Sequence, residues 1–536
     1  SAGNMVQYGY NTGNGTLTSV TDSLNKTVTY TYNAMCALSG VSQTVSNLST
    51  GTTLNNSYEY TNDRLTGITA GNTVDYSFDY DLWGYQTEVS VGTQSLAEYT
   101  YGTGENCDRV ASVTFGNGQT IAFSYDSCNN VTGISYDGGT TYSYTYTYSS
   151  TNGLTSVTDN ISDQITYFTD NGYEIYTIPQ TGQGVLLYSS SYDDDDNFVQ
   201  TANGYTYTFA DGTAETEIEA ETRRTTGLTV KCSTISSTGT SLALSASTDF
   251  FGRPVNRTLG VKDGTNNLGS VAVDYTYQNS TGDRTTEFVS NYKNVVTPTT
   301  GTATNVEYTY TYDANGNIVS DSLGGTLKHS YVYDEAGQLV RVNDAVQNRT
   351  FCYTYDNGGN LVNKKRYAYT TGTLGSVLQT TATYAYSDSN WKDRLTSFNS
   401  IPLSYDAIGN LTYFDGRTFS WTAGRQLAGF ELNTDDYAVT YKYNADGLRT
   451  QKYIDDDQTY TDTTYDYIWA EGKLVSQTDG TDVLYFLYDS NDSPIGFVLN
   501  DAATYLYIKN LQGDITGIAD ENGAIIVNYT YDEWGK

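Results

Sequence analysis

The sequence predicts an all-β protein built from a repeated hairpin, and three observations carry that prediction. Tyrosine alternates with threonine over residues 308–312, which places the tyrosines on one face of a strand. Each such run ends in Asp followed by Gly three residues later, and these residues favour turns. The composition agrees: 53 Tyr and 51 Gly stand against 5 Pro, and Thr, Tyr and Val suit a pleated surface.

One unit therefore reads as a strand, an Asp-x-x-Gly turn and an aliphatic pair that begins the returning strand. Tyr333 follows Tyr312 by 21 residues and Tyr355 follows Tyr333 by 22, enough for two strands and two turns. Later units lie at about double this spacing, as if alternate copies had lost the motif. The residues assigned to the structural repeat motif are Tyr312, Asp313, Gly316, Tyr333, Asp334, Gly337, Tyr355, Asp356, Gly359, Tyr405, Asp406, Gly409, Tyr531, Asp532 and Gly535.

The repeats run along the whole chain, with varying clarity. Residues 1–158 hold degenerate copies, residues 159–273 form a divergent middle section, and residues 274–536 hold clear copies. No Pro/Ser-rich linker interrupts them, so we predict one continuous β domain over residues 1–536.

Two acidic runs, residues 193–196 and 215–221, lie in the middle section. We predict that both are exposed loops. A site for a hard cation is the alternative, because such ions take clustered carboxylates. Neither run has the alternating ligands and glycine of an EF-hand loop, so no metal site is assigned.

Charge and composition exclude several classes of function. The net charge of −34 argues against binding nucleic acid, whose phosphates need a Lys/Arg surface. No apolar run approaches the length of a membrane span. The first five residues resemble the interior of a longer chain rather than a secretory signal peptide. Any export signal is therefore expected to lie elsewhere.

No catalytic or cofactor-binding residue is assigned. The chain has one histidine, His329, and no Cys-x-x-Cys, which argues against a zinc site and a histidine-assisted nucleophile. The motif aspartates recur in every clear unit, and a role that recurs is a folding role, whereas catalysis needs one distinct site. The five cysteines (Cys36, Cys107, Cys128, Cys232 and Cys352) are odd in number and far apart, so no disulfide framework is expected.

Aromatic side chains could also bind sugars. For the motif tyrosines a cross-strand ladder is the simpler interpretation, because neighbouring strands place like residues side by side. Trp83 and Trp534 occupy the same motif position, and that equivalence favours a structural role.

The repeated Tyr-Asp units resemble those of the Rhs, or YD-repeat, proteins. Residues 505–535 strengthen the resemblance, because the run from Asn510 to Asp514 precedes a last Tyr-Asp-x-Trp-Gly unit at residues 531–535, as at the end of an Rhs core. The resemblance implies a β-strip wound in a spiral into a hollow, cocoon-like shell. The mean hydropathy of −0.48 and the alternation of Tyr with Thr, Ser or Asp favour a single β layer around a cavity over a packed solid core.

The same resemblance implies two functions. In the toxin branch the shell encloses and delivers a C-terminal toxic domain, with an immunity protein as a further partner. In the adhesion branch, an extracellular protein binds partners or glycans without cargo. The family's self-cleavage aspartates lie beyond the last repeat and have no counterpart here, so neither cleavage nor toxicity is assigned to this chain. A secreted or cell-surface bacterial protein, monomeric and without cofactors, is expected.

Overall fold

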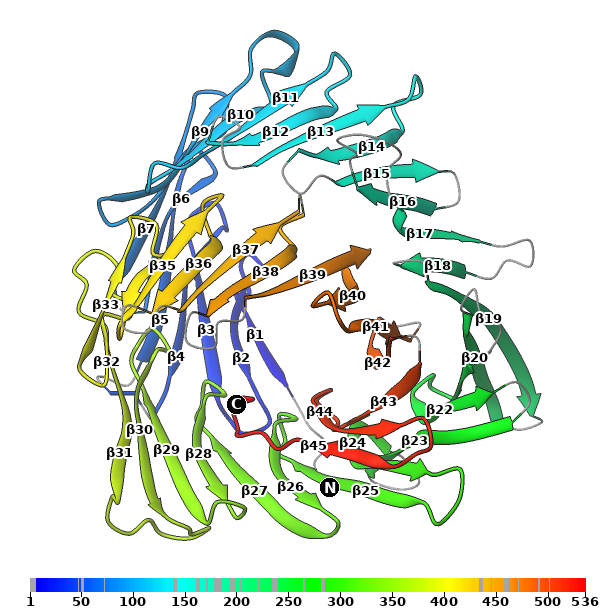
Figure 1. The fold of residues 1–536 in the computed structure, drawn as a ribbon. Coiled ribbons are helices and arrows are strands. Elements are labelled where there is room, and N and C mark those ends of the chain that lie inside the picture. The colour runs from blue at the N-terminus through cyan, green and yellow to red at the C-terminus, as the bar shows by residue number, and fades with distance from the viewer. Residues whose placement is uncertain are drawn as a thin grey trace.

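The structure is a computed structural model, and over the residues it describes it forms a strip of 45 antiparallel strands in which each strand pairs with the next (Figure 1). It describes residues 6–536 except 47, 50–52, 72, 138–141, 161–163, 170–171, 178–185, 193–197, 203–204, 219–220, 234–239, 264–265, 281–284, 433–436, 445, 457–461, 471, 490–491 and 501, with backbone alone for most of 192–244. Within this part of the chain, the one helix is the 3-10 turn η1 (Gly104–Asn106). No helix among these residues has the length and apolarity to cross a bilayer.

The strip winds into a spiral, hollow shell, so the predicted fold class is confirmed. The first coil comprises β1 (Gln7–Tyr10), β2 (Leu17–Thr21), β3 (Thr27–Tyr32), β4 (Leu38–Thr44), β5 (Thr53–Thr61), β6 (Arg64–Ala70), β7 (Val74–Tyr80), β8 (Gln86–Val91), β9 (Gln94–Tyr101), β10 (Val110–Phe115), β11 (Thr120–Tyr125), β12 (Val131–Tyr136), β13 (Tyr142–Tyr148), β14 (Leu154–Asp159), β15 (Gln164–Thr169), β16 (Gly172–Thr177), β17 (Leu186–Tyr192), β18 (Phe198–Ala202), β19 (Tyr205–Ile218), β20 (Glu221–Ser233), β21 (Thr240–Thr248), β22 (Pro254–Asp263), β23 (Asn266–Asn279) and β24 (Thr285–Thr297).

The second coil follows the first, and the chain ends near the point marked C in Figure 1. It comprises β25 (Thr304–Tyr312), β26 (Ile318–Leu323), β27 (Thr326–Tyr333), β28 (Leu339–Asp344), β29 (Arg349–Tyr355), β30 (Leu361–Ala368), β31 (Gln379–Ala385), β32 (Ser397–Phe398), β33 (Ile401–Tyr405), β34 (Leu411–Phe414), β35 (Arg417–Thr422), β36 (Gln426–Leu432), β37 (Tyr437–Tyr443), β38 (Arg449–Asp456), β39 (Thr463–Ala470), β40 (Lys473–Thr478), β41 (Val483–Tyr488), β42 (Pro494–Leu499), β43 (Ala503–Lys509), β44 (Ile515–Asp520) and β45 (Ile525–Asn528).

The Asp-x-x-Gly turn is closed by its aspartate. Asp313 Oδ1 accepts hydrogen bonds from the backbone N–H groups of Asn315 and Asn317, both at 2.9 Å. Asn317 Nδ2 donates to the other oxygen, Asp313 Oδ2, at 2.9 Å. Gly316 has φ of 90°, a conformation that strains any residue with a Cβ. These contacts explain why Asp, Gly and Asn recur at these positions.

Most tyrosines at the end of a motif strand tie that strand to the strand before it, although Tyr405 does not. The Tyr333 hydroxyl donates to the backbone carbonyl of Ile318 at 2.9 Å, and that of Tyr355 donates to the carbonyl of Leu339 at 2.7 Å. The same contact occurs at Tyr80, Tyr101, Tyr125, Tyr148, Tyr277, Tyr312, Tyr386, Tyr443, Tyr488 and Tyr531. The tyrosines therefore link successive hairpins along one edge of the strip. The interpretation of the motif tyrosines as a cross-strand ladder did not include this hydroxyl hydrogen bond.

A β-bulge beside the same tyrosine curves the strip. Thr311 pairs with Ser320 but Tyr312 pairs with Ile318, so the returning strand carries one extra residue. The same register shift occurs before Tyr333 and Tyr355. Bulges bend a strand and increase its twist, and a bulge at the same place in unit after unit curls the strip in one direction.

Successive coils meet edge to edge. Ser49 N–H donates to the carbonyl of Tyr355 at 2.6 Å, and Leu48 forms a parallel bridge with that tyrosine. Lys26 Nζ donates to the carbonyl of Asp334, also at 2.6 Å. Because each strand already pairs with its neighbours along the strip, these contacts join the turn-bearing edges of the two coils rather than open strand edges.

The spiral tightens towards the C-terminus. Residues that bond across neighbouring coils are 308 positions apart at Lys26–Asp334, 289 at Asn117–Asp406, 232 at Arg257–Asp489 and 180 at Tyr353–Glu533. The separation lies between 289 and 319 residues for hydrogen bonds made from residues 22–144, and it is smaller for those made from residues 257 and 353.

The largest apolar core lies where the second coil packs onto the first. It joins Leu259, Val271 and Val296 of the first coil to Leu487 and Leu506 of the second. All five side chains are buried. The shell is thus two layers thick here, and the buried aliphatic residues come from segments far apart in sequence.

One expectation for the acidic runs is wrong. Residues 215–218 end β19 and are paired with β20, with Glu215 opposite Arg224 and Glu217 opposite Thr222. This stretch is therefore part of a paired hairpin and not a loop. The run at 193–196 lies outside the described residues.

Candidate functional site

A cavity of about 850 Å³ lies under the C-terminal segment, residues 529–536. Its walls come from β25, β26, β27 and the turn after β28, and the C-terminal segment covers it. The cavity contains the chain's one histidine together with several carboxylates. His329, Asp321 and Asp344 in its lining are not residues of the repeat motif.

His329 lies between two carboxylates. Its Nδ1 is 3.0 Å from Asp321 Oδ1, and its Nε2 is 3.7 Å from Asp344 Oδ1. The Tyr331 hydroxyl donates to Asp321 Oδ1 at 2.8 Å. The strand period places His329 and Tyr331 on one face of β27, and β26 supplies Asp321 beside them. An imidazolium, with a proton on each nitrogen, suits this position best.

Glu533 fixes the C-terminal segment to the wall of β29 and β30. Its side chain is 2% exposed and accepts hydrogen bonds from Lys364 Nζ at 2.9 Å and from the Tyr353 hydroxyl. The Trp534 ring meets the Tyr353 ring edge-on, with centroids 5.4 Å apart. A buried ion pair of this kind costs desolvation, and losing one partner leaves the other charge uncompensated.

Three side chains around this cavity have shifted pKa values, raised for His329 and Glu533 and lowered for Lys364. Burial lowers the pKa of His329, but the hydrogen bond to Asp321 and the charges of Asp321, Asp344 and Glu533 outweigh burial, so this pKa lies above 6.5. Burial raises the pKa of Glu533 above 4.5, and burial lowers that of Lys364.

These shifts predict how stability depends on pH. The stability contributed by His329 is complete below about pH 6.5 and is lost as pH rises through the folded pKa. The cost of ionising Glu533 is absent below pH 4.5 and complete above its raised folded pKa. Both shifts therefore predict a folded state that is more stable in mild acid than at higher pH.

The motif residues do not converge on one site. Their turns follow one another along an edge of the strip, and of the assigned residues only Tyr333, Tyr531, Asp532 and Gly535 line the cavity. Asp334 and Tyr355 are buried at contacts between coils. Among the described residues, no group of three His, Cys, Asp or Glu side chains has the arrangement of a metal site.

Sequence reasoning missed Asp321, Asp344 and Glu533. The available signal was weak: Asp321 stands where neighbouring positions are Ser, and Glu533 is a variable position of the motif turn. Only the return of the C-terminal segment onto β29 brings Glu533 to Lys364.

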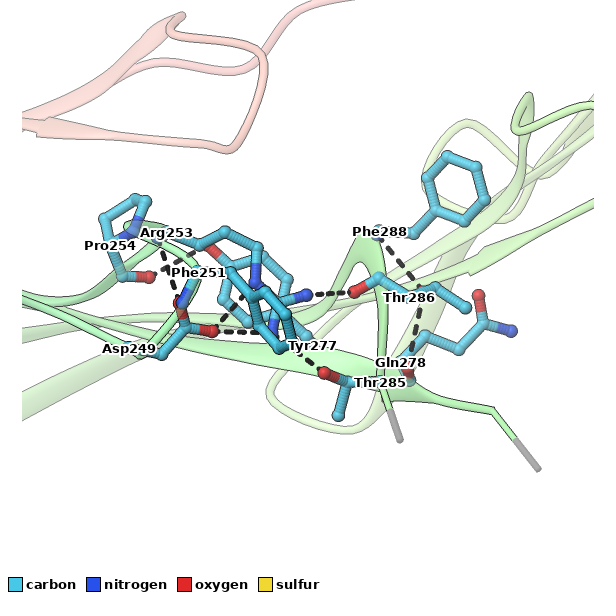
Figure 2. Close-up of polar contacts among 9 residues, drawn as sticks. All are labelled: Asp249, Phe251, Arg253, Pro254, Tyr277, Gln278, Thr285, Thr286 and Phe288. Carbon is cyan, nitrogen blue, oxygen red and sulfur yellow. Dashed lines mark hydrogen bonds and ion pairs between the residues drawn. The ribbon is translucent and has the colours of Figure 1, made fainter. Parts of the chain in front are cut away.

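Some turn tips carry large apolar side chains that the structure exposes. Leu82 is 100% and Trp83 is 83% exposed, so the proposed structural role of Trp83 finds no support in packing. Phe251 is 76% exposed at the turn shown in Figure 2, where Arg253 pairs with Asp249 and lies over the Tyr277 ring at 4.1 Å.

Comparisons with known families and proteins agree with this architecture. The family model described as RHS Repeat matches residues 108–141. The tRNA3(Ser)-specific nuclease WapA of Bacillus spizizenii is 30% identical over 151 residues, and the tRNA nuclease WapA of Bacillus subtilis is 30% identical over 149. Each match spans 27% of this chain and 6% of the relative.

Solved structures match nearly the whole chain. The TcdB2–TccC3 crystal structure superposes with a TM-score of 0.70 at 13% identity, over 99% of this chain and 31% of that one. The Photorhabdus luminescens Tc holotoxin pore gives a TM-score of 0.71 at 14% identity, over 99% of this chain and 30% of that one. The shared feature at this identity is the fold, and this chain spans about a third of those structures.

Proposed function

We propose that this chain, which is an Rhs/YD-repeat protein, is the encapsulating shell of a polymorphic toxin and encloses a C-terminal toxic domain for delivery. The proposal includes secretion or display at a bacterial cell surface and an immunity protein that neutralises the cargo. We propose that the shell itself has no catalytic role and that the motif residues serve folding.

The observation that carries the proposal is the edge-to-edge closure of the coils. Backbone contacts such as Ser49 to Tyr355 join the first coil to the second, and Gly269 N–H donates to the carbonyl of Glu521 at 2.7 Å. Contacts of this kind between coils favour a closed wall around the interior of the shell. A β-strip that merely displayed side chains would not need seams between residues hundreds of positions apart.

The buried contact of Glu533 supports a position of the cargo inside the shell. It fixes the chain at residue 533 against β29 and β30, beside a cavity of about 850 Å³. A domain that follows this segment would start from a fixed point on the shell, which favours enclosure over free tethering.

Protease protection of the full-length protein tests the proposal. The complete natural chain, with whatever follows residue 536, should release no cargo fragment under limited proteolysis while the shell is intact. The cargo expressed alone should be digested under the same conditions. Equal digestion of the cargo in both forms would refute enclosure.

Adhesion is the second candidate, and the exposed turn tips favour it. Trp83 and Phe251 present aromatic faces to solvent, as glycan-binding surfaces do. A glycan array probed with the wild type and with Trp83→Ala decides it: binding that Trp83→Ala abolishes would support adhesion. Absence of binding by the wild type would remove this candidate.

A further inference from the structure

The contact that fixes the C-terminal segment brings together an amine and a carboxyl group that can react with each other. Lys364 Nζ lies 2.9 Å from Glu533 Oε1, although 169 residues separate the two in the sequence. A nitrogen that is hydrogen-bonded to a carboxyl oxygen is close to the separation of about 3–3.5 Å from which it attacks the carboxyl carbon. The two side chains therefore already lie in the arrangement from which an amide forms.

The surroundings of this pair are largely closed to water and rich in aromatic rings. The Glu533 side chain is 2% exposed and that of Lys364 is 19% exposed. Lys364 Nζ lies 4.4 Å from the centre of the Phe351 ring and 5.4 Å from the centre of the Tyr353 ring. The Trp534 ring packs edge-on against Tyr353. Exclusion of water disfavours the charged forms of both reacting groups, and it also opposes hydrolysis of an amide once the amide has formed.

The pKa shifts of the two groups favour their neutral, reactive forms. Burial lowers the pKa of Lys364 and raises the pKa of Glu533. Transfer of one proton from the ammonium to the carboxylate gives a neutral amine, which is a nucleophile, and a carboxylic acid, whose hydroxyl can leave. A pair exposed to solvent remains ionised instead, because water stabilises both charges.

Two neighbouring residues suit the course of such a reaction. The Tyr353 hydroxyl donates a hydrogen bond to Glu533 Oε1, the oxygen that gains negative charge when the nitrogen attacks the carbon. The Asp344 side chain is 3% exposed, and its charge acts on both Lys364 and Glu533. A base that can carry a proton between the two groups therefore lies beside them.

We propose that Lys364 and Glu533 join in an intramolecular isopeptide bond that the folded chain forms by itself. The lysine nitrogen attacks Cδ of the protonated Glu533 side chain, so an N–Cδ bond forms and the Cδ–OH bond breaks. A proton from the nitrogen joins the departing hydroxyl, and one water leaves. The step needs no oxidant, reductant or co-reactant. The bond attaches the C-terminal segment covalently to β30, whether or not a cargo follows that segment.

Mass spectrometry of the whole denatured chain tests this assignment. The measured mass should be lower than the mass of the sequence by one water, and digestion should give one branched peptide that joins Lys364 to Glu533. The pair of Lys473 and Asp492 is an internal control, because Nζ and Oδ1 are 2.7 Å apart there but the Asp492 side chain is 67% exposed. No branched peptide should join Lys473 to Asp492.

Lys364→Arg keeps a positive charge and a hydrogen-bond donor but replaces the amine with a guanidinium, which stays protonated and is not a nucleophile. This variant should show the full mass of its sequence. Its denatured chain should also migrate more slowly in electrophoresis than the wild type, in which the bond keeps a long loop closed. Lys473→Arg makes the same change at the exposed pair and should keep the loss of water. If Lys364→Arg fails to fold, the branched peptide of the wild type decides the question alone.

A wild-type chain that has the full mass of its sequence and gives separate peptides around Lys364 and Glu533 would overturn the proposal and leave an ion pair only. A loss of water that persists in Lys364→Arg would overturn it as well. Each of these results leaves the encapsulation proposal untouched, because protection of the cargo from protease does not depend on a covalent bond at Glu533.

Discussion

The seam between coils contains a glycine that tests the winding of the shell directly. Gly71 lies in the turn between β6 and β7, and a Cβ placed on it would be 1.9 Å from the backbone carbonyl oxygen of Asn357. A normal carbon–oxygen contact is about 3.3 Å, so Gly71→Ala must push the two coils apart by about 1.4 Å. The obstacle is backbone rather than a flexible side chain, so local rotation cannot relieve it.

The cost of this overlap is about 1–3 kcal/mol, as for other overpacked sites. It should appear at the seam, where the Ser49 amide donates to the Tyr355 carbonyl at 2.6 Å. If that hydrogen bond opens by local separation of the coils, amide exchange at Ser49 should accelerate by about 5- to 150-fold, since 1.4 kcal/mol is tenfold. Hydrogen-exchange mass spectrometry of the intact chain measures this rate.

Gly375→Ala is the matched control. A Cβ on Gly375 meets nothing within 4 Å and its φ is not positive, so the variant shares the loss of unfolded-chain entropy without the clash. Gly375→Ala should leave both the melting temperature and exchange at Ser49 unchanged or slightly improved. Identical exchange at Ser49 in the two variants would refute the stacking of these coils.

Three further outcomes are expected. Tyr333→Phe should lower the free energy of unfolding by about 0.5–1.5 kcal/mol, because it removes the hydroxyl that donates to Ile318. Tyr413→Phe, at a residue 40% exposed, should leave that free energy unchanged. Equal melting temperatures of the two variants would count against the linking role of the motif tyrosine. Gly337→Ala should cost about 1–2 kcal/mol because φ is 77° with open space around it, and an unchanged melting temperature would contradict strain there. Wild-type stability should fall as pH rises above about 6.5 and through the raised folded pKa of His329. His329→Gln should flatten that part of a pH series of thermal melts; a slope unchanged in the variant would exclude His329 as its source.

Strand, turn and repeat were readable from the sequence because they depend on neighbouring residues. The alternation of Tyr308, Tyr310 and Tyr312 gave β25, and Asp313 with Gly316 gave the turn that follows it. The bulge beside Tyr312 repeats as faithfully as these residues but has no sequence mark of its own, because a register shift is a property of two paired strands.

The candidate sites were outside the reach of sequence reasoning for the same reason. Glu533 reaches Lys364 across 169 residues, and Asn294 reaches the carbonyl of Lys509 across 215. These separations follow from the circumference of each coil, which is the accumulated result of many small bends.

The sequence by itself determined that this chain is a β-strip of repeated Tyr-Asp hairpins, since hydrogen bonds within one or two hairpins suffice for that. Only the tertiary structure decided which hairpins lie side by side. The number of residues in a circuit falls from 308 to 180 along the chain, and that contraction sets every contact between coils. The core and the contact of Glu533 with Lys364 lie at such contacts, so they depend on the curvature of the whole strip, whereas His329 meets Asp321 and Asp344 on the neighbouring strands of the same coil.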